Sequence, residues 1–158
     1  MVAEDREGKV VFPGDKWWFA RLKQRIGIMP LLKLIVFDDE LALCELISEF
    51  AAEAEFEAVS ATTVDAFLAH LRAVPADVVA IDLHVPGVHT DDVMRCIAES
   101  RPNAAVLLMT GAAEEAFANA ERLGRRRGLR ICGRLQKPFT LEEIIDLLKR
   151  LHGEIEHC

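Results

Sequence analysis

The stretch LLKLIVFDDE (residues 31–40) joins an almost purely apolar run to three consecutive carboxylates. The apolar part, residues 31–37, has the length and the branched side chains of a buried strand. Acidic side chains are favoured in the first turn of a helix, where they offset the positive end of the helix dipole. One carboxylate would be enough for that purpose, so the crowding of Asp38, Asp39 and Glu40 calls for a second explanation.

Length, composition and charge narrow the class of protein. The 158 residues are 51% hydrophobic, which is enough for one domain with a substantial core. The net charge of −7 argues against nucleic-acid binding, which needs clustered Lys and Arg. Four scattered cysteines form no C-x-x-C pair and are expected to be reduced thiols. Because no apolar stretch approaches the ~20 residues that cross a bilayer, we expect a cytoplasmic protein without a membrane span.

Strand-like and helix-like periods alternate along the rest of the chain. Buried strands are predicted at residues 31–37, 56–60, 77–82, 105–109 and 131–135. Helices are expected at about 40–53, around 64–71, from about 90 to 97, over about 113–128 and from 140 to about 151. Five strands alternating with five helices imply a parallel sheet covered on both faces, which is a doubly wound α/β fold.

Local signals also predict details of three helices. Thr90 is expected to cap the helix that follows it, and Thr140 with Glu143 forms a capping-box pattern at the start of the last helix. The helix after Glu40 is predicted to bury the residues at positions i, i+3, i+4 and i+7 of one face, namely Leu43, Leu46, Ile47 and Phe50.

Polar residues follow four of the five predicted strands. Asp38 and Asp39 follow the first strand, Asp82 ends the third, Thr110 follows the fourth and Lys137 follows the fifth. Ligands of open α/β sheets bind beyond the carboxyl ends of the strands, so we expect these side chains to converge. Clustered carboxylates repel one another, and Mg²⁺ with a substrate phosphate removes that conflict. A hydroxyl and an ammonium group beside them suit the charge of a phosphoryl group in transfer.

In combination, these motifs resemble those of the receiver domains of two-component response regulators. The resemblance runs over about residues 31–152 and depends on four motifs in order: Asp38-Asp39, Asp82 followed by Leu83-His84-Val85-Pro86-Gly87, Thr110-Gly111, and Lys137-Pro138-Phe139. It implies the flavodoxin-like receiver fold, with five helices around a five-stranded sheet of strand order 2-1-3-4-5.

The resemblance implies a signalling role and no enzyme activity beyond the domain's own phosphorylation and slow dephosphorylation. Asp82 would accept a phosphoryl group from a histidine kinase or a histidine phosphotransfer protein and become an acyl phosphate. Thr110 and Lys137 would contact the phosphoryl oxygens. The resemblance also implies a cis Lys137–Pro138 bond.

The resemblance further implies how Mg²⁺ is bound. The ion would be held by Asp39 and Asp82, by Asp38 mostly through water, and by the backbone carbonyl of His84.

Arg134 departs from the family pattern, because many receivers have an aromatic residue three positions before the lysine whose rotation reports phosphorylation. We expect phosphorylation to change a protein contact, either self-association or a downstream partner, on the surface of about residues 113–151 that includes Arg134.

Two other functions are alternatives to a phosphoacceptor. A degenerate receiver could act as a phosphorylation-independent interaction module, but the complete set of site residues argues against it. A Mg²⁺-dependent aspartyl-phosphate phosphatase of the haloacid-dehalogenase class needs D-x-D after its first strand, and the sequence VFDD (residues 36–39) does not supply it.

The first thirty residues differ in character from the rest of the chain. An aromatic run at residues 17–19 leads into several basic residues. Residues 1–30 are expected to form an N-terminal extension that packs on its own domain, pairs with a second copy or is disordered, and a membrane-surface helix is a further alternative. Residues 31–152 form the expected receiver domain, and residues 153–158 a C-terminal tail.

Overall fold

The computed structural model describes residues 3–4, 10–11, 26–27 and 31–156. Two short strands near the start, β1 (Ala3–Glu4) and β2 (Val10–Val11), pair with each other in antiparallel fashion. Most of the expected N-terminal extension, including the aromatic run at residues 17–19, lies outside the described residues. In the described ranges no helix is long and apolar enough to cross a membrane.

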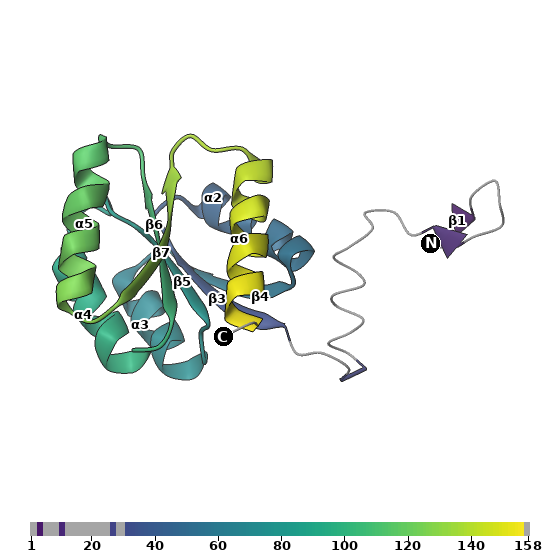
Figure 1. Cartoon of the computed structure of the whole chain (residues 1–158), viewed down its shortest axis with the longest axis horizontal. Helices are drawn as coiled ribbons and strands as arrows, with labels where there is room; N and C mark the ends of the chain where they lie inside the picture. Colours follow the sequence, from purple (N-terminus) through teal and green to yellow (C-terminus); the bar gives the residue numbers. More distant parts are fainter. Residues whose placement is uncertain (1–2, 5–9, 12–25, 28–30, 157–158) are drawn as a thin grey trace.

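The main body is a five-stranded sheet with five α-helices, as the alternation of periods predicted (Figure 1). Its elements in chain order are β3 (Leu32–Phe37), α2 (Leu41–Ala51), the short 3₁₀ helix η1 (Ala52–Ala54), β4 (Phe56–Ala61), α3 (Val64–Ala73), β5 (Val78–Asp82), α4 (Thr90–Ser100), β6 (Ala105–Thr110), α5 (Glu114–Arg126), β7 (Arg130–Gln136) and α6 (Leu141–Glu156). The strand order is β4-β3-β5-β6-β7, and every pairing is parallel. This is the predicted doubly wound order 2-1-3-4-5.

The sheet separates two layers of hydrophobic core. Helices α3, α4 and α5 cover one face, and α2 and α6 cover the other (Figure 1). In β3, Ile35 and Phe37 point into the first layer, whereas Leu34 and Val36 point into the second, and all four are fully buried. Both faces of a central strand are covered in such a fold, which explains why β3 is apolar without interruption.

The edge strand β7 is less protected than the central strands. All five residues of β5 are buried, whereas Leu135 is the only residue of β7 in that class. The register against β6 also shifts between Val106 and Leu107, so that Cys132 forms a bulge. Strand β7 therefore depends on fewer apolar contacts than its neighbour β6.

The two predicted helix caps had different outcomes. At α6 the capping box is confirmed, because Thr140 N donates to Glu143 Oε2 at 2.7 Å and Glu143 N donates to Thr140 Oγ1 at 3.1 Å. The prediction for Thr90 was wrong, because His89 is the N-cap residue of α4 and Thr90 is already helical. The Thr90 hydroxyl instead donates to the carbonyl of Leu83 at 3.4 Å, which ties the helix to the end of β5.

Helix α2 buries a different set of residues from the predicted one. Ile47 is buried as expected, but Leu46 is 37% exposed, and Cys44 and Ala51 complete the buried stripe. The spacing of large apolar residues did not identify the buried face of α2, because two of its three buried residues, Cys44 and Ala51, have small side chains.

Candidate functional site

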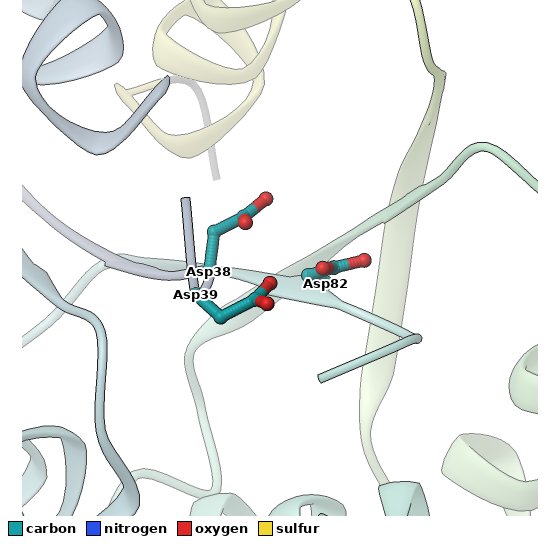
Figure 2. A group of neighbouring side chains, drawn as sticks. All are labelled: Asp38, Asp39 and Asp82. Atoms are coloured by element: carbon teal, nitrogen blue, oxygen red, sulfur yellow. The ribbon is translucent and has the colours of Figure 1, made fainter. Parts of the chain in front are cut away.

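The three aspartates of the candidate site meet at the carboxyl ends of neighbouring strands. Strands β3 and β5 pair in parallel, with Phe37 opposite Ile81, so the residues that follow them lie side by side. Asp38 and Asp39 come from the end of β3 and Asp82 from the end of β5 (Figure 2). One carboxylate oxygen from each lies within 4.8 Å of the others.

The three carboxylates differ in exposure. Asp38 is fully buried, Asp82 is 9% exposed and Asp39 lies at the surface. Burial raises the pKa of Asp38, and the nearby charge of Asp82 adds to that effect, although hydrogen bonds from Lys137 and from the backbone of Glu40 oppose it. The cluster is therefore a buried concentration of negative charge that is open to solvent on the Asp39 side.

Lys137 provides positive charge beside this cluster. Its Nζ lies 2.6 Å from Asp38 Oδ2, 3.4 Å from Asp82 Oδ2 and 3.8 Å from Glu40 Oε1. Burial opposes the charge on Lys137, but the hydrogen bond to Asp38 and the surrounding acidic groups raise its pKa overall. Its backbone N–H donates to the carbonyl of Thr110 at 2.8 Å, and the Lys137–Pro138 bond is cis, as expected.

Thr110 ends β6 and is fully buried beside the cluster. Its Oγ1 accepts a hydrogen bond from Ala112 N at 3.0 Å and lies 2.9 Å from Nδ1 of His84. The backbone N–H of His84 also donates to Asp82 Oδ1 at 3.2 Å. The contact between the His84 ring and Thr110 was not predicted from the sequence, since nothing in the local pattern indicates where a loop side chain points.

Asp38 is held in place by its own surroundings. Its backbone N–H donates to the carbonyl of Ala61 at 3.2 Å, which continues the ladder between β3 and β4. Glu40 N donates to Asp38 Oδ1 at 2.9 Å, and the thiol of Cys44 donates to the carbonyl of Asp38 at 3.3 Å. Burial, with a contribution from the charge of Asp38, raises the pKa of Cys44 to about 11, so this cysteine is a neutral packing residue. Its supporting role was not foreseen.

The chemistry of the donor set fits a hard divalent cation. Carboxylate oxygens are the ligands such ions prefer, and Lys137 alone does not balance three aspartates. Among the residues that the structure describes, this is the single group of three or more acidic, His or Cys side chains close enough to share an ion. The triad is thus consistent with a divalent-metal site.

Arg134 lies away from this cluster, on β7, and contacts α5. Its guanidinium forms ion pairs with Glu121 and Glu114 and lies 5.5 Å from the ring centroid of Phe117. The hydrogen bond to Glu121 is the largest of the effects that raise the pKa of Arg134, and the same bond lowers the pKa of Glu121. The residue at the expected aromatic position is therefore already paired within the chain.

Comparisons with known proteins agree with this architecture. A response regulator receiver domain model matches residues 34–149. A CheY-like receiver domain protein from Methanospirillum hungatei JF-1 superposes with a TM-score of 0.68 at 17% identity, covering 80% of this chain and 98% of that one. A receiver domain protein from Clostridium thermocellum gives 0.64 at 22% identity, with coverages of 80% and 98%.

A response regulator from Burkholderia pseudomallei, solved with a phosphorylated aspartic acid, a calcium ion and citrate, has a TM-score of 0.63 at 20% identity. The superposition includes 80% of this chain and 71% of that protein. No curated protein sequence matches. At these identities the solved structures show the fold, and the family model, which spans well over half of the chain, shows the family. The chain belongs to the response regulator receiver domain family.

Proposed function

We propose that the protein is the phosphoacceptor of a two-component phosphorelay and that Asp82 receives the phosphoryl group. The observation that carries the proposal is that the Asp82 carboxylate lies beside both the carboxylates of Asp38 and Asp39 and the ammonium group of Lys137, whose Nζ is 3.4 Å from Asp82 Oδ2. A nucleophile in that position has carboxylates next to it that suit a metal ion and an ammonium group next to it that suits the phosphoryl oxygens.

The proposed reaction is a direct transfer from a phosphohistidine of a histidine kinase or phosphotransfer protein. A carboxylate oxygen of Asp82 attacks phosphorus, the new P–O bond forms as the P–N bond breaks, and the leaving imidazole nitrogen keeps the electron pair. Lys137 and Thr110 are proposed to contact the phosphoryl oxygens and to stabilise their charge.

The proposed metal is Mg²⁺, which when bound would neutralise charge that develops on the phosphoryl oxygens. Asp39 and Asp82 would hold it directly, Asp38 mostly through water, and His84 through its backbone carbonyl. The chemistry of the three carboxylates supports this assignment.

The proposal is tested by incubating the chain with acetyl phosphate and Mg²⁺ and measuring the intact mass. We expect one acid-labile phosphoryl group, as an acyl phosphate gives, in the wild type and none in Asp82→Asn. Asp92→Asn is the matched control, since Asp92 is an exposed acid of α4 paired with Arg95. Label that persists in Asp82→Asn would overturn the assignment, and a wild type that takes no label would favour a phosphorylation-independent interaction module.

We further propose that phosphorylation alters a protein contact on the surface of residues 113–151, centred on Arg134. The pairing of Arg134 with Glu114 and Glu121 supports this, because a change in β7 or α5 would free a guanidinium that pairs well with a carboxylate of a partner. Sedimentation velocity with and without phosphodonor, on wild type and Arg134→Ala, tests it. Identical association in all four conditions would remove self-association through Arg134 from the proposal, and a pull-down under the same conditions tests for a separate partner.

The proposed division of the chain assigns this function to residues 31–152, with residues 1–30 as a separate extension and 153–158 as a tail, although residues 153–156 continue helix α6. The same proposal places the protein in the cytoplasm, where histidine kinases transfer their phosphoryl groups.

A further inference from the structure

The ring of His84 has no part in the function proposed so far, although it contacts a buried group of the site. His84 lies two residues after Asp82 on an exposed loop, yet its Nδ1 lies 2.9 Å from Oγ1 of the fully buried Thr110. The loop is anchored at this point, because Leu83 N donates to the carbonyl of Met109 at 2.9 Å and His84 N donates to Asp82 Oδ1. These two hydrogen bonds fix the backbone that leads into His84 beside the end of β6, where Thr110 lies.

The hydrogen bonds of Thr110 define what the imidazole does. The hydroxyl oxygen already accepts the backbone N–H of Ala112 at 3.0 Å, and a hydroxyl has one proton to donate. Within the described part of the chain, the possible acceptor for that proton is Nδ1 of His84, which lies 2.9 Å from the hydroxyl oxygen. Because a buried donor without an acceptor is costly, the tautomer with Nδ1 unprotonated is favoured, since it gives the Thr110 proton an acceptor.

We propose that His84 is a positioning residue that holds the Thr110 hydroxyl in the unphosphorylated chain and competes with the phosphoryl group for its proton. This inference rests on the proposed phosphoacceptor function. A phosphoryl oxygen on Asp82 can accept the Thr110 proton only when the bond to His84 is broken. His84 therefore favours the resting arrangement of Thr110, and its removal stabilises the phosphorylated arrangement.

The test measures the affinity of the full chain for beryllofluoride, a phosphoryl analogue, in the presence of Mg²⁺ at one fixed pH. We expect His84→Ala to bind it roughly 2- to 12-fold more tightly, which is the effect of one neutral hydrogen bond. His84→Asn, which places an amide group close to the position of Nδ1, should restore the wild-type affinity. His89→Ala is the matched control, since His89 is an exposed histidine of the same loop.

A double-mutant cycle shows whether His84 acts through Thr110. In a Thr110→Val background, which removes the hydroxyl and keeps the shape, His84→Ala should leave the affinity unchanged. Thr110→Ala serves if the valine variant does not fold. An equal gain in the presence and absence of the hydroxyl, or no gain in the wild-type background, would overturn the inference.

A second measurement needs neither metal nor analogue. In the metal-free protein, His84→Ala should shift the NMR signal of the Ala112 amide, whose acceptor is the same hydroxyl oxygen, and His89→Ala should leave it in place. An unmoved Ala112 signal in His84→Ala would also overturn the inference. If Asp82 takes the phosphoryl group but His84→Ala changes neither the beryllofluoride affinity nor the Ala112 signal, the proposed role of His84 is wrong and the phosphoacceptor function is retained. If the chain binds no beryllofluoride and takes no phosphoryl label, both the phosphoacceptor function and the role of His84 are wrong.

Discussion

Two charged clusters of the molecule have more acid than base, but they differ in burial. The strand-end cluster consists of Asp38, Asp39, Asp82 and Lys137, and the α5–β7 cluster consists of Arg134, Glu114 and Glu121. Both clusters combine carboxylates with one basic side chain, and they differ in how far those side chains are exposed to water. Lys137 is 17% exposed at its side chain and Asp38 is fully buried, whereas the side chains of Arg134 and Glu114 are 36% and 75% exposed.

The direction of the pKa shifts reflects this difference. Burial raises the pKa of Asp38 despite its contact with Lys137, whereas the hydrogen bond from Arg134 lowers the pKa of Glu121. At the α5–β7 cluster, solvent and two arginines, Arg134 and the more distant Arg125, balance the acidic side chains. The strand-end cluster keeps negative charge that the protein itself does not neutralise, and this residual charge makes it suitable for a cation.

The largest effect that separates the clusters should be on metal affinity. Asp39→Asn removes one carboxylate charge from the strand-end cluster. If Asp39 is a ligand as proposed, Mg²⁺ affinity measured by calorimetry should fall by more than about 10-fold, since even partners outside the ligand sphere contribute on the order of 10- to 100-fold. Glu114→Gln, in the α5–β7 cluster, should leave it unchanged. Equal losses in both variants would mean that Mg²⁺ responds to overall charge and not to this site.

A second test compares the stability of the metal-free chain in urea. Lys137→Ala leaves the buried carboxylate of Asp38 without its cation, and we expect the free energy of unfolding to fall by about 3 kcal/mol. Arg134→Ala should have a much smaller effect, because its partners remain solvated. Mg²⁺ binding to Lys137→Ala should be nearly intact. A loss of stability as large in Arg134→Ala would remove the distinction drawn from burial.

The smallest expected effect is the pH dependence of the α5–β7 cluster. The pKa of Glu121 is lowered from 4.5 in the folded chain, so its ion pair contributes stability above that pH and loses it as pH falls through the folded value. The stability difference between wild type and Glu121→Gln in urea should therefore shrink on acidification. In an Arg134→Gln background the pH dependence should become much smaller, because only the more distant Arg125 then pairs with Glu121. An undiminished pH dependence there would show that Arg134 is not its cause.

The fold and the convergence of the acidic residues could be predicted from sequence for a simple reason. Continuous apolar strands that alternate with helices permit few arrangements other than a parallel sheet, and parallel strands bring their carboxyl ends to one edge. Asp38 and Asp82 could therefore be placed together without knowing any side-chain conformation.

The unpredicted features depend on contacts between segments far apart in the chain. The contact between His84 and Thr110 spans 26 positions, and that between Arg134 and Glu114 spans 20. Neither contact has a periodic signal in the sequence, because each depends on how a loop or helix packs against the sheet. The exposed Leu46 was missed for a related reason, since hydrophobic spacing identifies a face of α2 only to within a neighbouring residue.

The exposure of β7 has a consequence for how the protein can lose its function. Lys137 follows this strand directly and is 99 positions from its partner Asp38, so it stays beside the aspartates only while the edge of the sheet is closed. Edge strands with few buried side chains open at lower free energy than central ones. Local detachment of β7 would withdraw the ammonium group while β3 and β5 still hold the carboxylates together. Heat or a destabilising substitution in β7 would then leave a molecule that still binds a cation but is a poor phosphoryl acceptor, well before the sheet as a whole unfolds.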